Sequence, residues 1–419
     1  MASTSITELI DRAITDVARE KFEEACLLFS VAEVAQKSEN ALHGLVDDLS
    51  TQKNPSYDEW TANFYLQWYQ ARQIFLAYQI FSKELSEQLS DHARDCPKEP
   101  VILFDFGAGS MAALVGLVIA IAKLPITPQW LPQVHVCNQD PSSAMLDLGR
   151  AFWSRFKALT GRYAPNSRLK SVMENATFNT TTDVYEYKIL ADEYSRRGGA
   201  KILTSFHTIY REPRHQLKSV GTHLDRVWCA LRPQKGWLTA NENSQSLVND
   251  LHDDLTHLEI NRKSVNEHDR ECICDRKLNQ ITRFRSDVML PKLECFLKSS
   301  SRNLLRAPVP MFKHNNLIYE IISVTRSSAT KINPVESVFK REINSNVEVM
   351  SKRPPVNRPN WDFPIVGACD RGHRIEMTSM RDFNGLEGLA FCTVCVWPYR
   401  FRLVGERWIT IAGNPNVWG

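Results

Sequence analysis

Short apolar runs that alternate with longer stretches of helical periodicity constrain the fold of this chain more than any other feature. The runs cover residues 101–104, 134–137, 201–206 and 236–240, and a β-branched run follows at 316–325. Strands that alternate with helices form a parallel sheet with helices on its faces. We therefore predict an α/β domain over residues 99–330.

The regions on either side of this domain have different sequence patterns from it. Residues 1–98 show helical periodicity with few helix breakers, which predicts a helical leader domain. Residues 331–419 begin with a polar, proline-bearing connector and continue with short segments typical of strands, which predicts a small β module. Three domains suit a chain of 419 residues, and a hydrophobic content of 43% excludes global disorder.

Charge and cysteine content limit the classes of partner and compartment. Lys and Arg number 51 against 48 Asp and Glu, and a net charge of +3 does not by itself indicate nucleic-acid or membrane binding. The first twenty residues include four acidic side chains and no apolar signal segment, and the chain has ten cysteines. We expect a reducing, cytoplasmic location. The longest apolar run, 111–122, is too short to span a bilayer, so we expect no membrane partner.

A glycine turn follows the first predicted strand. Residues 101–106 lead into Gly107-Ala108-Gly109, and an apolar helix begins near Met111. The glycines let the backbone approach a ligand closely, and the helix start presents free N–H groups to an anionic group. Residues 107–112 also satisfy the dinucleotide fingerprint, but the acidic ribose partner expected about 20 residues later is missing.

The same turn resembles motif I of class I S-adenosylmethionine-dependent methyltransferases, because Asp105 two residues before Gly107 gives Asp-x-Gly-x-Gly. Three further segments match that family in chain order: Asp140-Pro-Ser-Ser-Ala-Met-Leu, the strand at 201–206 with His207 after it, and Leu231-Arg-Pro-Gln-Lys-Gly236. Met111 stands where the family often has a third glycine. The resemblance covers about residues 99–330 and implies a Rossmann-like methyltransferase sheet that uses S-adenosylmethionine.

The resemblance also implies roles for individual residues. Asp105 would anchor the methionine end of the cofactor, Asp140 would accept the ribose hydroxyls, and an acidic or amide group after the third strand would meet the adenine. The cofactor-binding residues implied are Asp105, Gly107, Ala108, Gly109, Asp140, Glu174, Asn175 and Ser205, and the catalytic candidates are His207 and Tyr210. Helix capping for the two aspartates and an ordinary strand-end histidine at 207 remain open alternatives.

A more local likeness bears on the methyl acceptor. Asp105-Phe-Gly-Ala-Gly109 together with Met145-Leu-Asp-Leu-Gly149-Arg150 resembles the ribosomal small-subunit methyltransferase-like family of bacteria and mitochondria. That family's proline-flanked cysteine cluster for an iron–sulfur centre is missing here. Structured RNA, including ribosomal RNA, is the acceptor that this likeness favours, and a small molecule or a protein comes next.

Cysteines near the carboxyl end predict a structural zinc site. Cys369 and His373 form one pair and Cys392 and Cys395 a second, which is the arrangement of a zinc ribbon. Four unrelated reduced side chains are the alternative. A second set, formed by His268, Cys272, Cys274 and Cys295, has the Cys-x-Cys spacing that suits zinc poorly.

We therefore predict a methyltransferase that uses S-adenosylmethionine and carries a structural zinc ion. Two alternatives stay open. The fold could serve as a catalytically inactive binding or assembly protein, with the altered turns marking lost catalysis. The glycine turn could instead serve a NAD(P)-dependent oxidoreductase.

Overall fold

In the computed structural model, residues 4–50, 55–96, 99–206 and 278–307 are described, with isolated positions between 223 and 231. Further strands are described by their backbone alone. The chain divides into two compact units, Met1–Ser328 and Ala329–Gly419.

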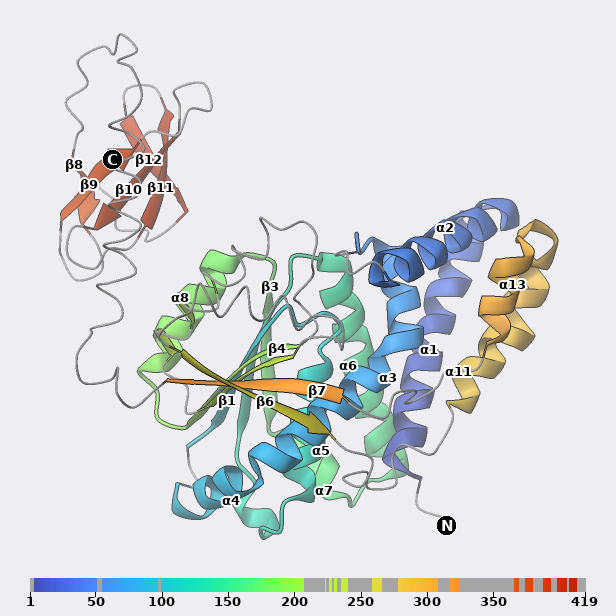
Figure 1. Ribbon diagram of the computed structural model, residues 1–419, viewed down its shortest axis with the longest axis horizontal. Helices are drawn as coiled ribbons and strands as arrows, with labels where there is room; N and C mark the ends of the chain where they lie inside the picture. Colours follow the sequence, from blue (N-terminus) through green and yellow to red (C-terminus); the bar gives the residue numbers. More distant parts are fainter. Residues whose placement is uncertain are drawn as a thin grey trace. The chain divides into compact units, whose positions relative to one another are not determined.

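A mixed sheet of seven strands forms the centre of the first unit (Figure 1). Its strands are β1 (Val101–Phe106), β2 (Val134–Gln139), β3 (Ala176–Thr181), β4 (Ala200–Phe206), β5 (Lys235–Thr239), β6 (Leu258–Val265) and β7 (Leu317–Val324). Their order is β3-β2-β1-β4-β5-β7-β6; the first five are parallel, and β7 is antiparallel to both of its neighbours. The predicted parallel α/β sheet is confirmed.

Two of these strands were not among the predicted apolar runs. Only the two end residues of β3 are buried, so it carries no continuous apolar stretch. The sequence of β6, LEINRKSV, is mostly polar. Apolar runs identify strands that are buried on both faces, such as β1, whose six residues are all buried.

Helices connect the parallel strands and cover both faces of the sheet. They are α5 (Ala112–Lys123), α6 (Ser143–Tyr163), α7 (Arg168–Glu174) and α8 (Val184–Ser195). Figure 1 shows α5 and α6 on one side of the sheet and α8 on the other. Among the described helices, none combines the length and the apolar character needed to cross a membrane.

Four helices precede the sheet and pack in the same unit: α1 (Ile6–Leu28), α2 (Val31–Ser50), α3 (Glu59–Glu84) and α4 (Ser86–Asp95). A capping box between Ser5 and Glu8 starts α1, and the Asp58 carboxylate caps α3 by accepting from Thr61 N at 2.7 Å. Helix α3 packs along α5 and buries Phe64, Phe75 and Phe81. This contact joins the leader to the helical layer that covers β1 and β2.

Residues 278–307 return to the leader from far along the chain. They form α11 (Asn279–Arg283), η3 (Phe284–Met289), α12 (Leu290–Leu293), η4 (Glu294–Phe296) and α13 (Ser299–Arg306). The buried Asp11 carboxylate of α1 accepts from Gln280 N at 2.9 Å and from Ile281 N at 3.1 Å. Burial raises the pKa of Asp11, and these hydrogen bonds lower it in part. The leader is therefore completed by a segment that follows most of the sheet in sequence.

The second unit contains an antiparallel sheet with the strand order β12-β11-β10-β9-β8. Its strands are β8 (Ile365–Ala368), β9 (Arg374–Ser379), β10 (Glu387–Cys392), β11 (Pro398–Val404) and β12 (Arg407–Ala412). Consecutive strands pair with each other, as in a meander. The predicted β module is present as backbone, and its zinc site remains a prediction.

Candidate functional site

The glycine turn lies at the carboxyl end of β1, where the strand order reverses between β1 and β4. In open α/β sheets this switch point is where ligands bind. Gly107, Gly109 and Met111 take left-handed conformations, with φ of 70°, 51° and 63°. Two backbone hydrogen bonds stabilise the turn: Ala108 N donates to Gln139 O, and Met111 N donates to Ala108 O, both at 2.8 Å. Met111 therefore adopts a backbone conformation that glycine usually takes, although it carries a side chain.

Helix α6 lies directly against this turn. A Cβ atom on Gly149 would lie 2.8 Å from Met111 Cγ and 3.0 Å from the backbone carbon of Ser110. A glycine at position 149 is therefore what allows the helix to approach. Gly149 is a site residue that the sequence analysis did not single out, although it lies within the Met145–Arg150 segment of the local likeness.

The Asp140 carboxylate bridges the turn and the start of α6. Its Oδ2 accepts from Gly109 N at 2.8 Å, and its Oδ1 accepts from Ser142 N at 2.9 Å. Burial raises the pKa of Asp140 to about 6, and the two N–H hydrogen bonds lower it in part. A carboxylate has about four acceptor positions, so two remain for a ligand. That number suits the two hydroxyls of a ribose.

The second carboxylate, Asp105, sits near the end of β1 and is 2% exposed. Its Oδ1 accepts from Thr204 Oγ1 on β4 at 2.7 Å. Burial raises the pKa of Asp105 to about 7; the Thr204 hydrogen bond lowers it, and the charge of Asp140 raises it further. Because each ionised carboxylate disfavours the other, a cationic group bound between them would be stabilised by both.

The helical leader also reaches the turn. Gln70 of α3 donates from Nε2 to Ser110 O at 2.8 Å, and Ser110 Oγ donates to Gln70 Oε1. Ser142 Oγ donates to Tyr57 O at 2.9 Å, just before α3 begins. No local sequence pattern indicates Gln70 or Thr204, because their hydrogen-bond partners lie 40 and 99 positions away in the chain.

The structure brings most of the predicted cofactor residues to one edge of the sheet. Asp105, Gly107, Ala108, Gly109 and Asp140 all belong to the turn and the strand ends beside it. Ser205, also predicted, is buried on β4 next to Thr204. His207 and Tyr210 lie outside the described residues.

Glu174 and Asn175 lie elsewhere, which corrects the predicted adenine contact. The apolar residues before them form α7 and not the third strand; Glu174 ends that helix and Asn175 caps it. Strand β3 begins only at Ala176, which pairs with Val134 at the start of β2. The two residues are therefore at the opposite edge of the sheet from Asp140. Glu174 is exposed there, and its carboxylate lies 3.6 Å from Lys170 Nζ.

The predicted metal ligands fall mostly outside the described residues. This holds for Cys369, His373 and Cys395, and Cys392 is described only by its backbone at the end of β10. Of the second set, His268, Cys272 and Cys274 also lie outside. Cys295 is described as an exposed free cysteine.

Comparison with known proteins gave structural matches only. No family model matches the chain, and no curated protein matches it. A putative class I S-adenosylmethionine-dependent methyltransferase from Listeria monocytogenes is 8% identical at a TM-score of 0.34, over 77% of this chain and 88% of that chain. Magnesium protoporphyrin IX methyltransferase from Synechocystis PCC 6803, with bound SAM, is 10% identical at a TM-score of 0.27, over 70% and 97%.

A plantazolicin methyltransferase in complex with SAH is 13% identical at a TM-score of 0.29, over 74% of this chain and 99% of that chain. All three of these similar structures are methyltransferases by their names. At these identities and TM-scores, the likeness adds nothing to the chemistry of the glycine turn described above.

Proposed function

We propose that this chain is a methyltransferase that uses S-adenosylmethionine, bound at the glycine turn. One observation carries the proposal: two buried carboxylates, Asp105 and Asp140, flank a left-handed glycine turn at the switch point of a parallel sheet. The cofactor would supply a methyl group on a sulfonium, together with an ammonium and a ribose diol. A cation and a diol are the two groups for which this pair of carboxylates is suited.

Asp105 and Asp140 would each bind a different group of the cofactor. Asp105, held by Thr204, would accept from the ammonium group. Asp140, held by Gly109 N and Ser142 N, would accept from the ribose hydroxyls through its remaining lone pairs. Methyl transfer is an in-line displacement, so catalysis depends mainly on holding donor and acceptor about 3–3.5 Å apart and on excluding water. His207 and Tyr210 remain the proposed acceptor-side residues, with His207 as a base, and Ser205 remains a proposed cofactor contact.

Calorimetric titration of S-adenosylmethionine and S-adenosylhomocysteine tests the site. We expect the wild-type protein to bind both, and Asp140→Asn to bind each at least about tenfold more weakly, because one hydroxyl acceptor becomes an N–H donor. Asp147→Asn is the matched control, since Asp147 lies on α6 with a 63% exposed side chain. Loss of binding in both variants, or in neither, would contradict the assigned role of Asp140.

The titration also separates the alternatives. An inactive binding or assembly protein predicts no heat with either ligand. An oxidoreductase predicts that NAD(P) raises the melting temperature and that S-adenosylhomocysteine does not. No described residue favours these alternatives over the methyltransferase.

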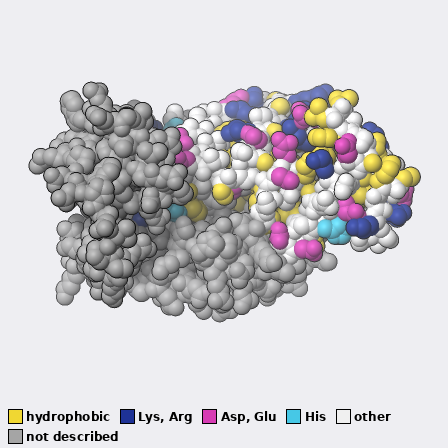
Figure 2. All heavy atoms as spheres, turned by 90° about the horizontal axis from the view of Figure 1, so that it is seen from above, with side chains coloured by type: hydrophobic (Ala, Val, Ile, Leu, Met, Phe, Trp, Pro, Cys, Tyr) yellow, Lys and Arg dark blue, Asp and Glu magenta, His cyan; other side chains and the backbone are white. Residues whose placement is uncertain are grey.

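The acceptor is to be found by transfer of labelled methyl groups into fractionated cell extract. Structured RNA stays a prediction, with a small molecule or a protein as the next candidates. Figure 2 shows Lys and Arg side chains interspersed with Asp and Glu on the described part of the face in view. Label in the RNA fraction would support the first candidate, and label confined to another fraction would reject it.

Two further assignments belong to this proposal. A structural zinc ion held by Cys369, His373, Cys392 and Cys395 would stabilise the small second unit, in which hydrophobic burial is limited by size. Substituting Cys395→Ser in the full chain should then release about one equivalent of zinc. A cytoplasmic location stays a prediction.

A further inference from the structure

A second group of chemically active side chains lies at the other end of β1, where α4 gives way to the strand. His92 is in the last turn of α4, Cys96 is its C-cap residue, and Glu99 precedes β1 by two positions. One ring nitrogen of His92, Cys96 Sγ and one Glu99 carboxylate oxygen lie within 4.8 Å of one another. Among the described residues this is the one such group of three.

A closed ring of hydrogen bonds holds the three residues together. Cys96 N donates to His92 O at 2.8 Å, and Glu99 N donates to Cys96 O at 3.0 Å. His92 Nε2 lies 3.0 Å from Glu99 O, which completes the ring when this nitrogen carries the proton. Nδ1 then keeps its lone pair. A metal-binding histidine typically has one ring nitrogen fixed by a backbone carbonyl in this way.

The Glu99 carboxylate lies against Gly198. A Cβ atom on Gly198, in the loop before β4, would lie 2.6 Å from Glu99 Oε1. The missing side chain at 198 therefore makes room for the carboxylate. His92 and Cys96 are half-buried and Glu99 is exposed, so the group is open to solvent on one side.

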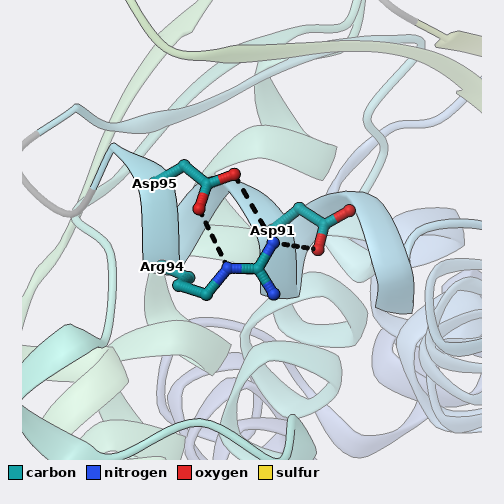
Figure 3. A network of polar contacts seen from close by, with 3 residues as sticks. All are labelled: Asp91, Arg94 and Asp95. Carbon is teal, nitrogen blue, oxygen red and sulfur yellow. Dashed lines mark hydrogen bonds and ion pairs between the residues drawn. The ribbon is translucent and has the colours of Figure 1, made fainter.

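The surrounding charge suits a cation. The group lies at the C-terminal end of α4, which is the negative end of the helix dipole. Arg94 pairs with Asp91 and with Asp95, each at 2.9 Å, and these three side chains carry a net charge of −1 (Figure 3). Lys201 of β4 interacts with the charge of Glu99 and offsets this −1, so the helix end is the feature that favours a cation here.

We propose that His92, Cys96 and Glu99 bind a zinc ion, with water as the fourth ligand. Imidazole, thiolate and carboxylate are the three protein ligands that zinc takes, at bond lengths of about 2.0–2.3 Å. Tetrahedral geometry at those lengths separates the ligand atoms by about 3.5 Å, so modest side-chain rotations close the site. Loss of the thiol proton to solvent accompanies binding, because zinc takes the thiolate.

This site is distinct from the glycine turn. Strand β1 separates the two, and its six residues span about 20 Å. A metal here would fix the end of α4 to the start of β1 and to the loop before β4. It would thus tie the leader helices to the two central strands, from which Asp105 and Thr204 project at the other end.

Metal titration of the full chain tests this site. Since the predicted zinc ribbon also binds metal, the protein to use carries Cys369→Ser and Cys395→Ser and is freed of metal by a chelator. Cobalt(II) reports a thiolate ligand by its charge-transfer absorption, and zinc displaces it for stoichiometry. We expect one equivalent of cobalt with this absorption, and its loss in Cys96→Ser. We expect His92→Ala to weaken zinc binding by more than about 100-fold, beyond the loss of an outer partner.

Two further variants keep the result decisive. Cys26→Ser removes a half-buried cysteine of α1 outside the group, and it should bind cobalt unchanged. Glu99→Gln alters an exposed side chain, and circular dichroism checks that the variant folds. The proposal is overturned if Cys96→Ser or Glu99→Gln, while folded, binds zinc as tightly as the parent protein does. It is also overturned if the cobalt complex lacks thiolate absorption.

Discussion

The carboxylates near the two ends of β1 differ in burial and in the direction in which their pKa values shift. At the carboxyl end, Asp105 and Asp140 are buried, and burial raises both pKa values to about 7 and about 6. At the amino end, Asp95 is exposed, and hydrogen bonding by Arg94 lowers its pKa. The pKa of a carboxyl group is thus raised at one end of β1 and lowered at the other. A bound cation is therefore expected to be stabilised most at the carboxyl end of β1, because the carboxylates there are buried.

The largest expected effect tests the buried end through pH. A folded-state pKa of about 7 against 3.8 means that the native protein binds this proton more tightly than the unfolded chain does. The stability that Asp105 contributes is therefore present below about pH 4 and is lost as the pH rises through about 7. Three pKa units correspond to about 4 kcal/mol. Urea unfolding of the ligand-free protein should show this decline between about pH 4 and pH 7, with this contribution levelling off above pH 7.

The variant Asp105→Asn isolates this contribution. Its amide can still accept from Thr204 but carries no charge, so at pH 8 it should be more stable than the wild type, and the difference should shrink towards pH 5. Asp147→Asn, on the exposed face of α6, should leave the pH profile unchanged. An unchanged profile in Asp105→Asn would show that Asp105 is not desolvated in solution.

The sequence anticipated the buried end of β1 better than the exposed one. Asp105, Gly107 and Gly109 lie at the end of β1 and Asp140 lies after β2, so a local pattern was enough to predict that they meet at one edge of the sheet. Thr204 and Gln70 could not be found in this way, because each acts through tertiary contacts with residues far away in sequence.

The errors have a similar physical origin. Val172 and Met173 are buried on α7, and the prediction that Glu174 follows the third strand depended on these two apolar residues. Short apolar runs do not distinguish a buried helical turn from a strand. The parallel sheet itself was predictable, whereas the return of residues 278–307 to the leader depends on contacts such as that between Asp11 and Ile281.

The second prediction tests how closely α6 must approach the turn. Gly149→Ala places a Cβ atom 2.8 Å from Met111 Cγ and 3.0 Å from the Ser110 backbone, so either the helix or the turn must shift. We expect a loss of about 2–3 kcal/mol in the free energy of unfolding, measured by urea denaturation. Gly161→Ala in the same helix is the matched control, because nothing lies within 4 Å of its Cβ position. It should stabilise the protein by up to about 1 kcal/mol, and equal losses in the two variants would contradict the close approach.

The third prediction concerns the link between the leader and the turn. Gln70→Leu leaves the buried Ser110 carbonyl and hydroxyl without their partners on α3. We expect a loss of about 1–2 kcal/mol. Adding Ser110→Ala should cost less in this background than in the wild type, since the hydroxyl has already lost its partner. Additive losses in this double-mutant cycle would mean that the two side chains do not interact in solution.

The smallest effect is expected at the exposed end. Arg94→Ala removes a pairing with Asp91 and Asp95 in which all three side chains are about 60% exposed. Such pairs gain little in water, because solvent screens the charges and ordering the side chains costs entropy. We expect no measurable change in Tm at moderate salt, and the variant should still bind zinc, because Arg94 supplies no ligand and its loss leaves more negative charge nearby. A fall in Tm comparable to that of Gly149→Ala would mean that surface charge at the start of β1 contributes as much as packing at its other end, and the contrast between the two ends would fail.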